Sequence, residues 1–215
     1  MRFKDLIVAV ATGRENLPSR RERVGGGRRR KGNDMRVSVP VLALSWALCS
    51  VLSGGVAMAE EPPVGPPAEV KALAGCWSGE GAVMGKPVTI ALAVKPVAGD
   101  AMMLVEADSH AKADPADAYA AHLLFGGRTT KAGEPAAIVG LWADSFGGDG
   151  ASMGTGAVAA DGFEVAYPYG RSSFVNRWSH KADKLSWSIV MRDAAGKEQG
   201  FASYDLARTA CAKGR

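Results

Sequence analysis

From residue 76 to residue 209 the chain consists of short segments in which apolar and polar residues alternate, and no helical period persists. Alternation is clearest near the C-terminus, where Leu185, Trp187 and Ile189 share one side of a segment and Ser186 and Ser188 share the other. A period of two with one apolar side is typical of half-buried antiparallel strands. The pattern predicts ten strands: Cys76–Met84, Val88–Val97, Ala101–Ser109, Ala118–Phe125, Ala136–Ser145, Ser152–Ala159, Phe163–Tyr167, Ser172–His180, Leu185–Arg192 and Gln199–Thr209.

Short strands joined by tight turns predict an all-β fold, either a sandwich or an up-and-down barrel. Cys76 opens the first predicted strand and Cys211 follows the last, and in a closed meander those two strands are neighbours. A disulfide between the two cysteines therefore favours an antiparallel barrel of about ten strands, with two free thiols as the alternative. Residues 67–74 are predicted to form a short helix that ends at Gly75.

The first 59 residues are predicted to lie outside this domain. Met35 and Arg36 precede an uncharged, largely apolar stretch that ends in Ala57-Met58-Ala59. This is the pattern of a secretory signal peptide over 35–59, cleaved near Ala59; a retained membrane anchor is the alternative. Residues 1–34 are interpreted as a start called too early or an extended basic leader, with a nucleic-acid-binding arm as a further reading. A proline-rich spacer over 60–67 then precedes the barrel domain, 68–215.

Removal of the leader reverses the charge. The whole chain has 26 basic and 22 acidic residues, a net charge of +4, but 11 of the basic and 4 of the acidic residues precede residue 60, which leaves −3. A mildly acidic domain gives no support for a nucleic-acid partner. We expect a periplasmic or secreted protein that meets a membrane only if the leader is retained. The pattern gives no oligomeric state.

The opening of the first predicted strand carries a resemblance. Leu73-Ala74-Gly75-Cys76-Trp77-Ser78-Gly79-Glu80-Gly81 contains Leu-x-Gly-x-Trp-x-Gly-x-Gly. It resembles the opening of calycin-like barrels, a pattern shared by nitrobindin-like haem barrels and by an uncharacterised bacterial family of secreted lipocalin-like domains. The resemblance implies that Trp77 plugs one end of the barrel, while Gly75, Gly79 and Gly81 let the strand bend. It implies a fold and not an activity.

The nitrobindin-like branch binds haem through one histidine, and this chain has His110, His122 and His180. None matches that ligand's setting. His110 and His180 fall at strand ends, where solvated histidines are ordinary, and His122 lies mid-strand, where a packed or hydrogen-bonded side chain is favoured over a haem ligand. No cofactor is therefore predicted, and haem binding stays an alternative.

Catalytic signatures are scarce: the chain has no His-Glu-x-x-His, P-loop or Cys-x-x-Cys motif, and no metal site is predicted. A barrel of this size can hold one small ligand in its mouth. Arg177 would bind a ligand carboxylate if it faced inward, or would lie in solvent if it faced outward. The leading hypothesis is an exported protein that binds a small apolar or amphipathic ligand; the alternatives are an interaction module with a filled core, a haem barrel or an uncharacterised enzyme. The candidate ligand-binding residues are Trp142, Arg177, Tyr119, His122, Tyr204 and Trp187.

Overall fold

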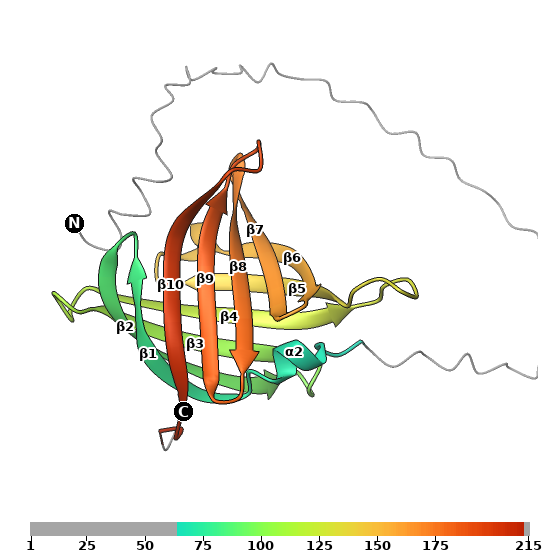
Figure 1. The fold of residues 1–215 in the computed structure, drawn as a ribbon, viewed down its shortest axis with the longest axis horizontal. Helices are drawn as coiled ribbons and strands as arrows, with labels where there is room; N and C mark the ends of the chain where they lie inside the picture. The colour runs from blue at the N-terminus through green and yellow to red at the C-terminus, as the bar shows by residue number, and fades with distance from the viewer. Residues whose placement is uncertain (1–63, 213–215) are drawn as a thin grey trace, which may run out of the picture. The chain divides into compact units, whose positions relative to one another are not determined.

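Residues 64–212 form an all-β domain in the computed structural model, which describes this part of the chain. The predicted leader over 35–59 and the residues before it lie outside the described residues. Ten antiparallel strands close into a barrel in which each strand pairs with its neighbours in sequence and β1 pairs with β10 (Figure 1). The strands are β1 (Gly75–Val83), β2 (Lys86–Val97), β3 (Met102–Ala111), β4 (Ala118–Arg128), β5 (Ala137–Asp144), β6 (Ser152–Ala159), β7 (Gly162–Tyr169), β8 (Ser172–Lys181), β9 (Lys184–Arg192) and β10 (Glu198–Thr209).

All ten predicted strands are confirmed, with small shifts at their ends. The strand that extends furthest beyond its predicted end is β4, which continues from Phe125 to Arg128. β7 continues through Pro168 to Tyr169, although the sequence pattern ended it at Tyr167. Proline is tolerated there because the β6–β7 pairing stops at Ala166, so the last residues of β7 are paired only with β8. The predicted helix is shorter than expected: α2 spans Ala68–Lys71 and is followed by a turn into β1. A short 3-10 helix, η1 (Gly148–Gly150), lies between β5 and β6.

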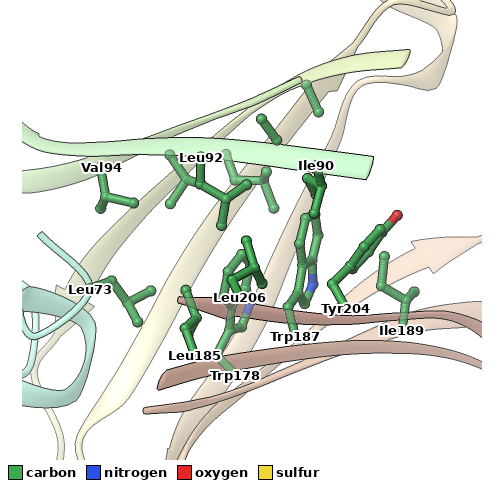
Figure 2. Close-up of a cluster of buried hydrophobic side chains, with 14 of the residues drawn as sticks. Leu73, Ile90, Leu92, Val94, Trp178, Leu185, Trp187, Ile189, Tyr204 and Leu206 are labelled. Atoms are coloured by element: carbon green, nitrogen blue, oxygen red, sulfur yellow. The ribbon is translucent and has the colours of Figure 1, made fainter. Parts of the chain in front are cut away.

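The inward-facing side chains fill the half of the barrel next to α2. Along β9, Leu185, Trp187 and Ile189 are buried and alternate with outward serines, as the period of two predicts. Figure 2 shows this inner layer from Leu73 to Ile189. Trp178 of β8 stacks on Trp187 with ring centroids 4.4 Å apart, a separation at which aromatic pairs add to the burial energy.

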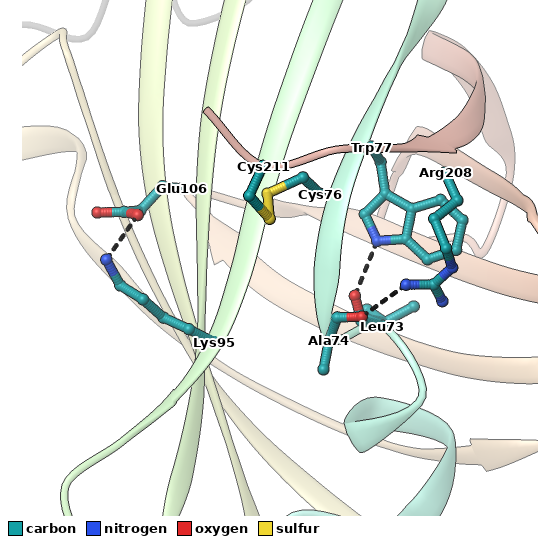
Figure 3. The surroundings of a disulfide bond; sticks show 8 residues. All are labelled: Leu73, Ala74, Cys76, Trp77, Lys95, Glu106, Arg208 and Cys211. Carbon is teal, nitrogen blue, oxygen red and sulfur yellow. Dashed lines mark hydrogen bonds and ion pairs between the residues drawn. A yellow bond between two sulfur atoms is a disulfide. The ribbon is translucent and has the colours of Figure 1, made fainter. Parts of the chain in front are cut away.

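One end of the barrel, where β1 begins and β10 ends, is closed. The Trp77 side chain is completely buried, and its indole N–H donates to the Leu73 carbonyl at 2.8 Å (Figure 3). The Arg208 guanidinium lies 4.1 Å from the indole centroid and donates to the Ala74 carbonyl at 2.9 Å. These contacts place Trp77 as a plug, as the resemblance implied. We call this the closed end.

The Cys76–Cys211 disulfide predicted from the cysteine positions is present and joins the start of β1 to the end of the chain after β10 (Figure 3). The glycines of β1 make room for the neighbouring strand. A Cβ added at Gly79 or Gly81 would lie 2.0 Å or 2.1 Å from a carbonyl oxygen of β10. Glycine therefore allows β10 to approach β1 closely where the barrel closes, while Gly75 supplies the positive φ of 118° at the turn from α2 into β1.

Candidate functional site

The opposite end of the barrel, where β1 ends and β10 begins, holds a cavity of about 260 Å³, and we call it the open end. The cavity is lined by inward side chains of β1, β4, β5, β6, β7, β8, β9 and β10 and by the β5–β6 loop that contains η1. Most of its wall is aromatic. The aromatic lining residues are Tyr119, Trp142, Phe146, Tyr167, Tyr169, Phe174, Trp187, Phe201 and Tyr204. The barrel is therefore filled toward the closed end and hollow toward the open end.

Four of the six predicted ligand-binding residues line this cavity: Tyr119, Trp142, Trp187 and Tyr204. Trp187 is central to them, with Tyr204 5.0 Å and Trp142 6.4 Å away between ring centroids. Their positions follow from strand alternation, because each lies on the inward side of its strand close to the open end. Trp187 and Tyr204 are almost fully buried, so they form the floor of the cavity rather than its mouth.

A chain of polar groups runs across one wall of the cavity. The Trp142 indole N–H donates to the Tyr119 hydroxyl at 3.1 Å, and that hydroxyl donates to Asp144 Oδ2 at 3.3 Å. The other carboxylate oxygen of Asp144 accepts the backbone N–H of Phe146 at 2.9 Å and so holds the start of the β5–β6 loop. A half-buried carboxylate in this position is oriented entirely by neutral donors among the described residues.

Three phenols of the cavity, those of Tyr119, Tyr167 and Tyr204, stay protonated near neutral pH. Burial, followed by the negative charge of Asp144, raises the pKa of Tyr119 well above its ordinary value. Burial alone raises the pKa of Tyr167 and of Tyr204. These hydroxyls therefore serve as neutral hydrogen-bonding groups and are poor candidates for a general base or an anionic nucleophile.

Tyr167 is the most constrained of these residues. Its ring meets Trp142 edge-on at 5.3 Å, and its hydroxyl lies over Gly140, where an added Cβ would come within 2.3 Å of the oxygen. The hydroxyl is buried and has no hydrogen-bond partner within residues 64–212. A buried hydroxyl without a partner costs free energy. The Tyr167 hydroxyl is therefore a hydrogen-bonding group in the cavity wall that no described residue satisfies.

Arg177 is placed on the outside of the barrel, which corrects its interpretation as an inward carboxylate ligand. Its guanidinium contacts Glu164 at 3.0 Å and Glu198 at 2.7 Å, and Arg192 also contacts Glu198 at 2.7 Å. The hydrogen bonds from Arg177, then those from Arg192, lower the pKa of Glu198 to about 2. We call these four residues the outer ion-pair cluster. Because strand alternation sends Phe174 and Trp178 inward, Arg177 faces outward and is not part of the cavity lining.

The histidines also lie away from the cavity. His122 is exposed on the outer face of β4, so neither a packed role nor a place among the ligand-binding residues holds for it. His180 packs edge-on against Trp77 at the closed end, and a ring nitrogen of His110 hydrogen-bonds the Pro115 carbonyl in an exposed loop. Within the described residues, the cavity thus offers no imidazole to a haem iron.

Sequence reasoning missed five aromatic lining residues: Phe146, Tyr167, Tyr169, Phe174 and Phe201. A signal was available for some of them. Tyr167 and Tyr169 are two residues apart and therefore share a face of β7, and Phe174 pairs with Tyr167 across the β7–β8 turn. Phe201 could not be placed in this way, because the β9–β10 register shifts between Gly200 and Ala202.

Residues 64–212 contain no group of three or more His, Cys, Asp or Glu side chains arranged to hold a metal ion. Over the same range, no helix has the length and apolar character needed to cross a membrane.

Comparison with known proteins supports the architecture. No protein-family model matches the chain, and no curated protein matches it. Among solved structures, the chain is similar to that described as the crystal structure of Rv2717c from M. tuberculosis, with a TM-score of 0.50 and 17% sequence identity over 67% of this chain and 99% of that one. At this identity the likeness concerns the fold alone: the described domain is a closed, ten-stranded antiparallel β-barrel with a structural neighbour of known fold.

Proposed function

We propose that the barrel is a binding protein that holds a small apolar or amphipathic ligand in the cavity of the open end. The observation that carries the proposal is the cavity itself, a hollow of about 260 Å³ with an aromatic wall and a few oriented polar groups. Ligand sites in proteins have this composition: a mostly apolar, concave surface with a small number of polar atoms that fix orientation. At about 30 Å³ for each water, the hollow corresponds to a ligand with on the order of ten non-hydrogen atoms.

The distribution of side chains within the barrel supports a ligand more than a filled interaction module. Toward the closed end, Phe125, Phe163 and Trp178 pack against one another, with ring centroids 5.3 Å, 5.9 Å and 6.0 Å apart. Toward the open end, Ser152 lines the cavity where a larger apolar residue would fill it. The chain therefore packs one half of its interior tightly and keeps the other half accessible.

The test uses the full chain and two matched variants. Neopentylbenzene, an uncharged probe of about the right size, should change the fluorescence of Trp142 and Trp187 on binding, and native mass spectrometry should detect any co-purified ligand. Ser152→Phe places a large side chain in the cavity and is expected to abolish binding. Thr155→Phe adds the same side chain on the outer face of the same strand and is expected to leave binding unchanged.

The outcomes separate the hypotheses. Binding that is lost in Ser152→Phe and kept in Thr155→Phe supports the cavity as the site. A bare mass in native spectra together with no response to the probe overturns the proposal and favours an interaction module. Binding that both variants retain shows that the probe lies elsewhere, and it likewise refutes the cavity site.

We further infer that the protein is exported and that the domain is related to the calycin-like barrels. The signal-peptide pattern over 35–59 supports export, and the Cys76–Cys211 disulfide is compatible with an oxidising compartment. The Leu-x-Gly-x-Trp-x-Gly-x-Gly opening and the closed meander support the kinship. N-terminal sequencing of protein recovered from the periplasm or medium should begin at Glu60. Recovery only from the cytoplasm with an intact N-terminus would contradict export.

A further inference from the structure

The charge in the cavity is of one sign. Two of the lining residues, Asp144 and Asp149, are acidic. No Lys, Arg or His of the described residues lines the cavity. Arg177, the cation expected there from the sequence, is held on the outer face by Glu164 and Glu198. A ligand that brings a carboxylate would therefore meet negative charge and find no counter-charge.

Asp144 is oriented toward the cavity without a cationic partner. Its two oxygens accept one hydrogen bond each, from the Tyr119 hydroxyl and the Phe146 backbone N–H, and it forms no ion pair with any residue between 64 and 212. A carboxylate can accept about four hydrogen bonds, so roughly half of its capacity is unused by the described chain. A half-buried carboxylate of this kind gains most from a positively charged donor, because a charge-assisted contact is stronger than a neutral one.

The aromatic wall also favours a positively charged ligand. Tyr119 and Phe146, which flank Asp144 in the hydrogen-bonded chain, lie 5.4 Å apart between ring centroids. Trp142 and Trp187 continue the wall deeper into the barrel. The faces of these rings carry negative electrostatic potential, and Trp and Tyr rings attract an ammonium group placed over them. The same rings provide apolar surface for the remainder of a ligand.

We propose that the cavity binds an organic cation, with an ammonium-type head near Asp144 and an apolar or aromatic body against the rings. This inference rests on the proposed binding function and names the class of ligand for that site. The carboxylate and ring faces supply the attraction for the head, while the volume of about 260 Å³ restricts the body to about the size of one substituted ring.

The test compares three small ligands of similar shape that differ in charge. Benzyltrimethylammonium, its uncharged carbon isostere neopentylbenzene, and the anion 3-phenylpropanoate are titrated into the full chain while tryptophan fluorescence is followed. The cation is expected to bind at least about tenfold more tightly than the neutral isostere, and the anion more weakly than either. Raising the ionic strength should weaken binding of the cation and leave the neutral probe unaffected, since only the former depends on a charge pair.

Asp144→Asn tests the residue. It keeps the shape and an acceptor oxygen but removes the charge, so it is expected to reduce the cation's preference to below about threefold while the affinity for neopentylbenzene stays unchanged. Asp205→Asn, on the outer side of β10 where Asp205 accepts from Ser186, is the control and should change neither affinity. If Asp144→Asn does not fold, the salt dependence of the unmodified protein decides the question.

Each result has one meaning. Equal affinity for the cation and its isostere, or a preference for the anion, overturns the inference while the proposed binding function stands. Failure of all three probes to bind removes the proposed function itself. A cation preference that Asp144→Asn leaves intact, or that does not fall with salt, also overturns the assignment to Asp144.

Discussion

The disulfide between Cys76 and Cys211 offers a quantitative test of how the barrel is closed. The two cysteines are 135 residues apart in sequence, so the bond closes a loop that contains nearly the whole domain. On the chain-entropy model, a loop of this length lowers the entropy of the unfolded chain enough to stabilise the fold by about 5 kcal/mol. Residual structure in the unfolded state reduces this figure, so we expect a loss of about 3–5 kcal/mol when both cysteines are replaced by alanine.

The assay is unfolding in urea, monitored by tryptophan fluorescence. It gives the free energy of unfolding of the disulfide-bonded protein and of the double variant Cys76→Ala, Cys211→Ala. Free energies are compared because the m-value should also rise: an unfolded chain without the cross-link exposes more surface. Kinetics give an independent check. Because the bond acts on the unfolded state, its loss should slow folding and leave the unfolding rate nearly unchanged.

A loss below about 1 kcal/mol, or a loss that appears wholly as faster unfolding, would refute this reasoning. The first result would mean that pairing between β1 and β10 already constrains the unfolded chain, and the second that the bond acts through the folded state. The control is Cys49→Ser in the uncleaved full chain, since Cys49 lies in the predicted leader and its replacement leaves both bridging sulfurs in place.

Three further predictions concern single side chains. Gly140→Ala, whose added methyl would meet the Tyr167 hydroxyl at 2.3 Å, should lower the free energy of unfolding in urea by about 1–3 kcal/mol. Tyr167→Phe removes a buried hydroxyl that lacks a partner among the described residues, so the same assay should show unchanged or higher stability, by up to about 1 kcal/mol. Arg177 and Arg192 lower the pKa of Glu198 from 4.5 to about 2. The contribution of Glu198 to stability is therefore present above about pH 4.5 and is lost as the pH falls toward 2. Glu198→Gln should flatten the plot of stability against pH within that window.

Each of these has a contradicting result. Full stability of Gly140→Ala would show that Tyr167 moves freely, and partial recovery of Gly140→Ala in the Tyr167→Phe background would confirm the contact. A clear loss of stability in Tyr167→Phe would mean that water or a ligand satisfies the hydroxyl. An unchanged pH profile in Glu198→Gln would show that solvent screens the exposed ion pairs completely.

The architecture was predictable because several local signals agree. Strand alternation, turn residues and the positions of Cys76 and Cys211 all point to a closed meander, and the structure has all ten strands. The site was only partly predictable. Trp187 and Tyr204 lie on strands with one clearly apolar side, so their inward direction followed from the pattern.

The sequence pattern did not predict that Arg177 and His122 face outward. On β8, Val175 is fully buried although it lies on the same outward side as Arg177, so both sides of the strand look apolar in sequence. On β4, His122 shares its outward side with Leu124, and again neither side is plainly polar. Arg177 faces outward because Phe174 and Trp178 of the same strand face inward. Its outer partners, Glu164 and Glu198, come from β7 and β10 and meet through the register between strands, which is set by the whole sheet.

The hollow at the open end should lower the free energy of unfolding. A variant that fills it therefore tests whether the hollow is a functional cavity or a packing fault. An enclosed, empty cavity costs about 24 cal/mol for each Å³, which for 260 Å³ gives about 6 kcal/mol, an upper bound because water enters through the mouth. Filling the hollow should therefore stabilise the fold. We expect Ser152→Phe to raise the free energy of unfolding by about 0.5–2 kcal/mol while it abolishes probe binding, whereas Thr155→Phe changes neither. A Ser152→Phe variant that loses stability would show that the cavity is already occupied by ordered groups, and the argument from an accessible hollow would then fail.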